Sequence, residues 1–306
     1  MTGKCSANQQ QLCAKHALYP IILMVCLSIS LWGCSPSQEM AEPLPEGITQ
    51  TRSSTQDQLE TYASLENIQQ KGVLVVGTAI TKPFEYHEPE TGELRGFDVD
   101  IANHIAKKMG VELEWVEMPF ANLLPALQEK KIDMTIAAMY ITPEREAQID
   151  FSTPYIKTGL IMVGQPETTK HIRNLQDLSG LSVGVKIGAT GETLAKDLRI
   201  EGIDLSIVEY KDTLDSLLDL EVGRVDVVFN DYLNTLIYIN EYQSDLSILT
   251  DENGNIMYLS QAGLGIAVHP SNQVLLSEIN SILDTMEKDG ITHQLYRNWF
   301  NIKYIN

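Results

Sequence analysis

One arginine near the start of a short predicted helix is the residue in this chain best placed to hold a small anion. The segment 132–152, IDMTIAAMYITPEREAQIDFS, opens with an apolar run that suits a buried strand. Thr142 and Pro143 follow as a helix start, with a hydroxyl at the N-cap and proline at the first helical position. Arg145 therefore falls in the first helical turn, just beyond the carboxyl end of a strand, where open α/β sheets bind ligands. Its guanidinium and the unpaired backbone N–H groups could receive a carboxylate; the alternative is a surface arginine paired with a neighbouring glutamate.

Composition limits the classes of function. The 306-residue chain carries a formal net charge of −19, which argues against a nucleic-acid partner because phosphate binding needs the opposite sign. All four cysteines precede residue 35, so the body of the chain offers neither a disulfide framework nor a cysteine metal site. The six histidines are scattered and no phosphate-binding loop or nucleophile elbow is present in the sequence. We therefore expect no metal and no cofactor.

The N-terminus has the pattern of an export signal. The apolar run Leu18–Trp32 is too short for a comfortable membrane span and right for a signal-peptide core. It leads into Leu31–Cys34, which resembles a bacterial lipoprotein cleavage box, although Trp32 occupies a position that usually holds a small or β-branched residue. We expect residues 1–33 to be a lipoprotein signal peptide, Cys34 to receive the lipid, and residues 34–66 to be a flexible tether poor in large apolar residues. A plain N-terminal anchor is the alternative, and both place the body outside the cytoplasmic membrane, in the periplasm or at the cell surface.

Strands and helices alternate along the rest of the chain, which predicts mostly parallel sheets flanked by helices. For the first unit we expect strands at 73–78, 113–118 and 132–138 and helices at 97–109 and 123–130, the second helix capped by Asn122. A second unit repeats the plan, with strands at 181–186, 205–210 and 225–230, a small-residue loop at 188–192 that leads into a helix through Leu198, and a helix at 214–220. A strand at 263–268 and helices at 272–289 and 292–300 close the chain.

Strand-like segments at 160–163 and 259–268 bracket the second unit. If both cross between the units, the chain leaves a first lobe, builds a second and returns, so that two crossings form a hinge beside a cleft. We expect lobe 1 to comprise residues 67–158 plus 262–306, and lobe 2 to comprise residues 159–261.

The body resembles the bacterial extracellular solute-binding proteins of family 3, the amino-acid receptors of ABC importers. The motifs that carry the resemblance are Pro83-Phe84, Gly96–Asp100, Leu123–Leu127, Lys131–Asp133, Ile141–Arg145, Ile149–Ser152, Gly184–Lys186, Phe229–Asp231, Gly263–Ala267 and Asp289–Ile291. The resemblance implies a type II periplasmic-binding-protein-like fold, an amino-acid ligand, an ABC transporter permease as partner, a lipid anchor in the membrane and no enzymatic activity. We expect a monomer.

The resemblance also implies how an amino acid would be held. Arg145 would grip the carboxylate, together with the backbone N–H and hydroxyl of Thr190 at a helix start in lobe 2. Asp231 would hold the ammonium with help from the carbonyl of Ala138; the alternative is that Asp231 caps the helix after it. Phe120 would pack on the ligand, or else belong to the ordinary core.

Departures from the family pattern bear on the ligand's side chain. Thr81 replaces an aromatic residue that often stacks on the ligand, and Tyr140 replaces a smaller hydroxyl residue near the carboxylate. The loop 77–81 lacks the acid that binders of basic amino acids usually carry. Lys186 and Asn230 could face the side-chain end of the pocket, although Lys186 could equally be a solvated lysine at a strand end. Together these residues favour a polar neutral or acidic side chain, glutamine-like more than arginine-like.

Two other functions occur on the same fold. One is a sensor that reports the ligand to a membrane receptor instead of delivering it to a permease. The other is an enzyme that resembles cyclohexadienyl dehydratase, whose length is close to that of this chain. Lytic transglycosylases share the fold but carry an additional catalytic domain.

Overall fold

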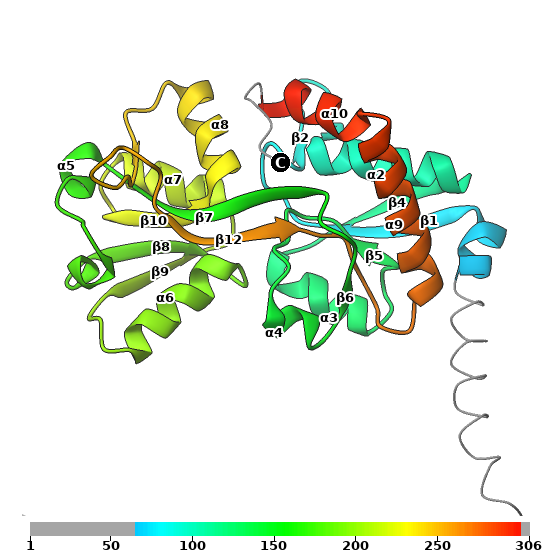
Figure 1. The fold of residues 1–306 in the computed structure, drawn as a ribbon, viewed down its shortest axis with the longest axis horizontal. Coiled ribbons are helices and arrows are strands. Elements are labelled where there is room, and N and C mark those ends of the chain that lie inside the picture. The colour runs from blue at the N-terminus through cyan, green and yellow to red at the C-terminus, as the bar shows by residue number, and fades with distance from the viewer. Residues whose placement is uncertain (1–64, 301–306) are drawn as a thin grey trace, which may run out of the picture. The chain divides into compact units, whose positions relative to one another are not determined.

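The computed structural model describes residues 65–300 (Figure 1). The predicted signal peptide, lipidation at Cys34 and nearly all of the predicted tether lie outside the described residues. Within residues 65–300, no helix combines the length and apolar character that crossing a membrane requires.

Two sheets form the framework. The first has the strand order β4-β1-β5-β13-β6, in which β1 pairs in parallel with β4 and β5, and β13 pairs antiparallel with β5 and β6. Its strands are β1 (Val73–Thr78), β4 (Glu112–Glu117), β5 (Met134–Thr135), β6 (Asp150–Phe151) and β13 (Ala267–Val268). A two-stranded hairpin, β2 (Tyr86–His87) and β3 (Leu94–Arg95), stands apart from it. Because β13 lies near the far end of the chain, the chain passes through every strand of the second sheet before it returns to the first sheet.

The second sheet has the order β11-β7-β10-β8-β9, and β12 pairs with β7 alone. Its strands are β7 (Ile156–Gly164), β8 (Ser182–Lys186), β9 (Ser206–Tyr210), β10 (Val227–Asp231), β11 (Ser247–Ile248) and β12 (Tyr258–Leu264). In this sheet β8 pairs in parallel with β9 and β10, whereas β7 pairs antiparallel with β10, β11 and β12. Both sheets are therefore mixed, but each has one opposed strand, β13 in the first and β7 in the second, so most strands of each sheet run in the same direction as predicted.

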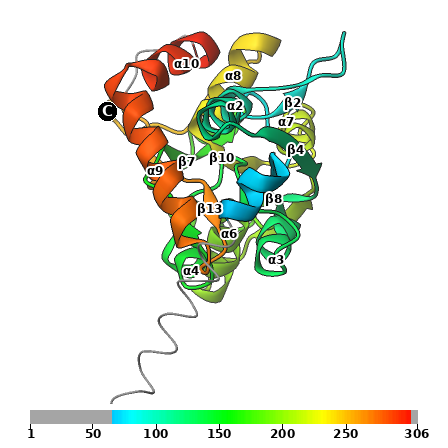
Figure 2. The same ribbon diagram turned by 90° about the vertical axis from the view of Figure 1, so that its right-hand side faces the viewer.

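Helices cover both faces of each sheet. Around the first sheet lie α2 (Phe97–Met109), α3 (Leu123–Gln128), α4 (Pro143–Glu146), α9 (Gln273–Lys288) and α10 (Ile291–Phe300), and Figure 2 shows α9 leading into α10. Around the second lie α5 (Pro166–Thr169), α6 (Thr190–Ile200), α7 (Thr213–Glu221) and α8 (Tyr232–Tyr242). Short 3-10 turns, η1 (Phe120–Asn122) and η2 (Leu175–Leu178), complete the set. We call the first sheet with its helices lobe 1 and the second sheet with its helices lobe 2.

The alternation of side chains along the strands explains why each sheet has two cores. In β1, Leu74 and Val76 join the core that includes α2, α9 and α10, while Val75 packs on the opposite side against the core of α3. In β10, Phe229 packs in the core that includes α6, whereas Val228 packs with α7 and α8. Successive strand residues point to opposite faces, so apolar runs such as these must be buried on both sides.

Two strands join the lobes. β7 and β12 lie side by side and antiparallel, with Leu264 paired to Ile156 at one end and Tyr258 paired to Ile161 at the other (Figure 1). The predicted crossing at 160–163 falls in β7, and the one at 259–268 overlaps β12 as far as Leu264 and then continues into β13 of the first sheet. The residue boundaries predicted for the signal peptide, tether and lobes stay a prediction.

Most predicted elements are confirmed, and the exceptions have local causes. The helix at 97–109 and the strand at 73–78 are found with those bounds. The strand expected at 132–138 is only β5, because Ala138 takes a left-handed φ of 48° that ends the extended backbone. Asn122 stands at the N-cap position of α3 but makes no side-chain cap bond, since it is already the last residue of η1.

Two acids are buried inside lobe 1. Asp98 and Glu85 are each 0% exposed. One oxygen of Asp98, Oδ2, accepts hydrogen bonds from the N–H of Ala138 (2.7 Å) and the hydroxyl of Tyr155 (2.9 Å). Burial raises the pKa of Asp98 to about 7, and burial together with the nearby charge of Asp98 raises the pKa of Glu85 well above its usual value.

The raised pKa of Asp98 makes stability depend on pH. Between about pH 4 and pH 7 the folded chain keeps a proton that the unfolded chain has lost, so stability falls as pH rises by about 1.4 kcal/mol per pH unit. We expect Asp98→Asn, which removes this proton equilibrium, to show a smaller fall in melting temperature between pH 5 and pH 8 than the unaltered protein. Asp284→Asn, at an exposed acid of α9, is the control and should keep the original slope. Equal slopes for Asp98→Asn and the unaltered protein would contradict the assignment.

Candidate functional site

The nine residues predicted to bind a ligand line one cavity of about 50 Å³ between the two lobes. They are Thr81, Phe120, Ala138, Tyr140, Arg145, Lys186, Thr190, Asn230 and Asp231. The sequence analysis did not single out the other residues of the wall, which are Ala137, Leu160, Ala189, Gly191, Thr213 and Phe229. Lipidation at Cys34 concerns a residue outside those described.

Arg145 is positioned by the start of α4. The hydroxyl of Thr142 accepts the N–H of Arg145 at 3.4 Å and so caps the helix as predicted. The guanidinium is 8% exposed and lies over the Phe120 ring, 5.4 Å from its centroid. It donates to the carbonyl of Tyr140 at 2.8 Å and to the carbonyl of Gly188, across the cleft, at 3.1 Å.

These contacts decide between the two interpretations of Arg145. The alternative of a surface arginine is wrong, because the side chain is buried and the guanidinium donates to two neutral backbone carbonyls. Burial lowers the pKa of Arg145 to about 10, so the group stays charged at neutral pH. A guanidinium has five N–H donors, so donors remain for a carboxylate after these two bonds.

Thr190 faces Arg145's cavity from lobe 2. It is the first residue of α6, and the cap position before it is Ala189, whose side chain cannot cap. Among the described residues, no partner is found for the buried hydroxyl oxygen of Thr190. A helix start with a buried hydroxyl in need of a partner is suited to an anionic group.

Asp231 ends β10 and caps α8. Its Oδ1 accepts the N–H of Asn234 at 3.0 Å, so the helix-capping alternative is right for one oxygen. Its Oδ2 accepts the hydroxyls of Tyr140 (2.6 Å, from lobe 1) and Thr158 (2.9 Å). Burial raises the pKa of Asp231, while these hydrogen bonds oppose that rise. A hydrogen bond from the backbone N–H of Leu233 also lowers the pKa of Asp231, so the protein uses most of the roughly four acceptor positions of this carboxylate.

Lys186 ends β8 and crosses to lobe 1. Its Nζ donates to Thr81 Oγ1 at 2.6 Å and to the carbonyl of Ile80 at 3.1 Å, and lies 5.3 Å from the centroid of the Phe120 ring. The side chain is 9% exposed, so the alternative of a solvated lysine is wrong. Burial lowers the pKa of Lys186, against the opposing charge of Glu85.

Asn230 reaches the wall but directs its donor nitrogen away from a ligand. Nδ2 donates to Thr235 Oγ1 at 2.9 Å and to the side-chain oxygen of Asn234, both in α8. The amide of Asn230 thus ties β10 to the helix beside it.

Asp98 does not line the cavity but holds one of its residues in place, a role that was not predicted from the sequence. It fixes the N–H of Ala138, the cavity residue with the left-handed backbone. The spacing of α2 held a signal for this role: Asp98 shares its helix face with Ala102, Ile105 and Met109, all buried. An acid on an apolar face requires partners within the protein.

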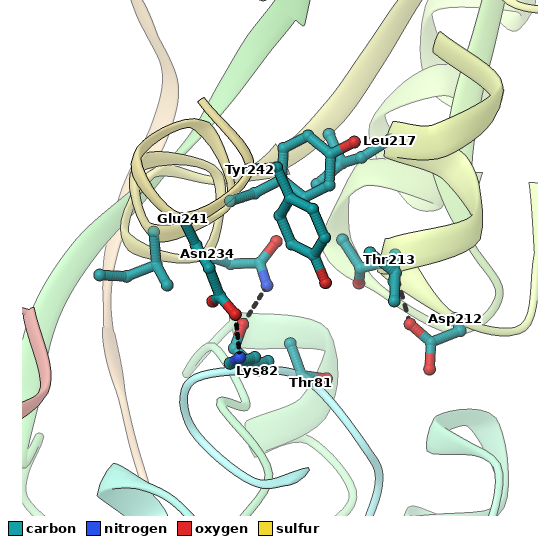
Figure 3. Close-up of a pocket in the computed structure, with 11 residues that line it drawn as sticks. Thr81, Lys82, Asp212, Thr213, Leu217, Asn234, Glu241 and Tyr242 are labelled. Atoms are coloured by element: carbon teal, nitrogen blue, oxygen red, sulfur yellow. Dashed lines mark hydrogen bonds and ion pairs between the residues drawn. The ribbon is translucent and has the colours of Figure 1, made fainter. Parts of the chain in front are cut away.

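A second cavity, of about 40 Å³, lies beside the first where the turn at Lys82 meets α7 and α8 (Figure 3). Lys82 and Glu241 form an ion pair of 2.5 Å across the lobes, and Asn234 Nδ2 donates to the carbonyl of Lys82. Thr81 and Thr213 line both cavities. We call the Lys82–Glu241 pair with the Asn234 bond the outer latch, because it joins the lobes outside the cavity that holds Arg145.

Comparisons with known proteins identify relatives of this chain. The family model for bacterial extracellular solute-binding proteins, family 3, matches residues 74–302. ABC transporter arginine-binding protein 1 of Escherichia coli K12 is 32% identical over 211 residues, which are 68% of this chain and 82% of that protein. L-cystine-binding protein TcyJ of the same strain is 30% identical over 236 residues, which are 77% of this chain and 85% of that protein.

Solved structures agree with the two-lobed architecture. The ancestral amino acid-binding protein AncCDT-1, a precursor of cyclohexadienyl dehydratase, matches with a TM-score of 0.69 and 30% identity, covering 78% of this chain and 99% of that one. The predicted fold class, a two-lobed α/β fold of type II with two hinge crossings, is confirmed. Since the family model matches far more than half of the sequence, this chain belongs to the bacterial extracellular solute-binding proteins of family 3.

Proposed function

We propose that this protein is an extracytoplasmic, lipid-anchored receptor that binds a polar amino acid between its lobes and delivers it to an ABC transporter permease. Relatives named as arginine-binding and cystine-binding proteins support an amino-acid ligand. The observation that carries the proposal is that one cavity brings together a buried guanidinium, a helix start with an unpaired hydroxyl and a buried carboxylate.

The ligand's carboxylate would bind Arg145 and Thr190. The two residues belong to different lobes, and both still have hydrogen-bonding capacity after their contacts within the protein. An anion there would supply the charge that the buried guanidinium lacks among its neutral carbonyl partners.

The ligand's ammonium would bind the buried carboxylate of Asp231, beside the hydroxyls of Tyr140 and Thr158. The carbonyl of Ala138 would add a second acceptor. In this arrangement Tyr140 keeps its bond to Asp231 while the ligand binds.

Binding would be coupled to closure of the hinge. Arg145, Tyr140 and Lys186 each bond to a residue of the opposite lobe, so the complete site exists only when the lobes meet. A ligand that contacts both lobes favours the closed arrangement by its difference in affinity for the two states. This is the kind of signal that a permease could read.

The wall favours a polar neutral or acidic side chain of about the length of glutamine. The wall presents Lys186 to the ligand's side chain, whereas a cationic side chain would need an acid there. Thr81, which accepts a hydrogen bond from Lys186, is small and polar.

A dehydratase is the second candidate, supported by the likeness to a precursor of cyclohexadienyl dehydratase. Release of an aromatic product from prephenate or arogenate by the purified protein would favour it.

The test of the proposed site is a thermal-shift screen of the twenty amino acids. A ligand at 100 times its dissociation constant should stabilise the purified protein by about 2.7 kcal/mol. We expect Arg145→Ala and Asp231→Ala each to abolish the shift while the protein still melts cooperatively. Arg224→Ala, at an exposed arginine of lobe 2, should leave the shift unchanged. Persistence of the shift in both site variants would refute the assignment.

Closure makes a second prediction. A methyl group at Gly188 would lie 2.8 Å from the Cα of Ala121 in lobe 1, so Gly188→Ala should hold the lobes apart. We expect a dissociation constant at least tenfold higher, a loss of about 1.4 kcal/mol, by isothermal titration calorimetry. Gly180→Ala is the matched control, because Gly180 has a similar left-handed backbone (φ +86°) with nothing near its Cβ position. A normal affinity in Gly188→Ala would show that closure to this distance is not required.

The outer latch makes a third. Its ion pair is 37% and 42% exposed, so it should contribute about 0.2–1 kcal/mol to the closed state. Glu241→Gln should weaken ligand binding about two- to fivefold at low salt, and less at high salt. Glu167→Gln breaks a comparable surface pair within lobe 2 and serves as control. An effect equal to that of Glu167→Gln would exclude a role in closure.

A further inference from the structure

We infer that the ligand is an amino acid whose side chain ends in an acid, and that Lys186 is the residue that selects it. The inference rests on the proposed function and narrows it: glutamate has the length of glutamine but carries one more negative charge.

The cavity presents two cations to a ligand. Arg145 and Lys186 come from opposite lobes and lie at similar distances from one aromatic ring, 5.4 Å and 5.3 Å from the centroid of Phe120. Contacts with the same ring keep both cations within the span of one small molecule. If Arg145 takes the α-carboxylate, Lys186 is left for the other end.

Lys186 has no carboxylate among its hydrogen-bond partners. Its ammonium has three donors, and the two bonds found go to a carbonyl and a hydroxyl, which are neutral. The third donor and the charge itself are available to a ligand. A buried ammonium with neutral partners gains more from an anion than from a neutral amide, because burial has removed the water that would otherwise stabilise it.

Two acids of the protein act on Lys186 through their charge, Glu85 and Asp212. Burial and the charge of Asp98 raise the pKa of Glu85, while the charge of Lys186 lowers it. Asp212 uses Oδ1 to accept the N–H of Leu214 at 2.8 Å and cap α7. Neither acid forms a direct bond to the ammonium among the contacts found in residues 65–300.

The same wall opposes a cationic side chain. Asp231 is the only acid among the described residues that line the cavity, and it accepts three hydrogen bonds from the protein. A guanidinium at the far end of a ligand would therefore meet Lys186 instead of a carboxylate. Specificity is a difference of affinities, and a like charge in a desolvated pocket supplies the repulsive part of it.

The experiment compares ligands that differ by one charge, using calorimetry on the purified full chain. L-glutamate should bind at least tenfold tighter than L-glutamine, and L-arginine should bind weakest. Lys186→Met keeps the length of the side chain without its charge, and should reduce the preference for glutamate over glutamine to twofold or less. Lys170→Met, at an exposed lysine of lobe 2, should retain the preference.

Each outcome separates this inference from the proposed function. Tighter binding of glutamine or arginine than of glutamate, abolished by Arg145→Ala, overturns the inference and leaves the receptor function standing. A glutamate preference that survives in Lys186→Met overturns the role of Lys186. Absence of binding by any amino acid overturns both. Because the comparison of glutamate with glutamine uses the unaltered protein, the inference can be tested even if Lys186→Met fails to fold.

Discussion

Charged groups enclosed between two lobes must find partners there, and this requirement organises the structure. Arg145 and Lys186 are almost fully buried, and each is satisfied in part by a neutral oxygen that belongs to the other lobe. A carbonyl or hydroxyl offers a buried cation less than an anion does. Both cations in the cavity therefore have hydrogen-bond partners, but these partners are neutral oxygens and do not balance their charge. A ligand with an anionic group would balance these charges only while the two lobes hold both cations close to it. Ligand affinity and closure of the lobes would therefore be coupled.

The framework supplies these groups from strand ends and helix starts. Lys186 and Asp231 are the last residues of β8 and β10, and Thr190 and Arg145 stand in the first turns of α6 and α4. At such places the backbone leaves regular pairing and side chains project beyond the sheet, while the rest of the strand stays fixed in the core. The buried acid Asp98 extends this support by holding the N–H of Ala138 in a backbone conformation that alanine adopts at some cost in free energy. Rigid elements therefore position the groups that line the cavity.

The sequence was sufficient for much of this description because the signals are local. The N-cap Thr142 with Pro143, the apolar period of α2 and the small-residue loop before Thr190 each specify a conformation within a few residues. The hydrogen-bond and ion-pair partners of the polar groups could not be predicted from the sequence, because the two members of each pair lie far apart in the chain. The sequence separation is 91 residues between Tyr140 and Asp231 and 159 between Lys82 and Glu241. No periodicity records which hydroxyl faces which carboxylate. The antiparallel pairing of β13 within its mostly parallel sheet could not be predicted for a related reason, because so short a strand carries too few residues to show how it pairs.

Tyr140 shows how one departure from a family pattern can act on the whole equilibrium. A small hydroxyl residue at this position could not span the cleft as the tyrosine ring does, and here the phenol reaches Asp231 in the other lobe at 2.6 Å. A bond made in the closed arrangement whatever the ligand raises the population of that arrangement, and apparent affinity rises with the fraction of molecules that are competent to bind. The same bond would reduce affinity if it used the last acceptor position of the carboxylate. Tyr140 therefore joins Arg145 and Lys186 as a link between the lobes inside the cavity.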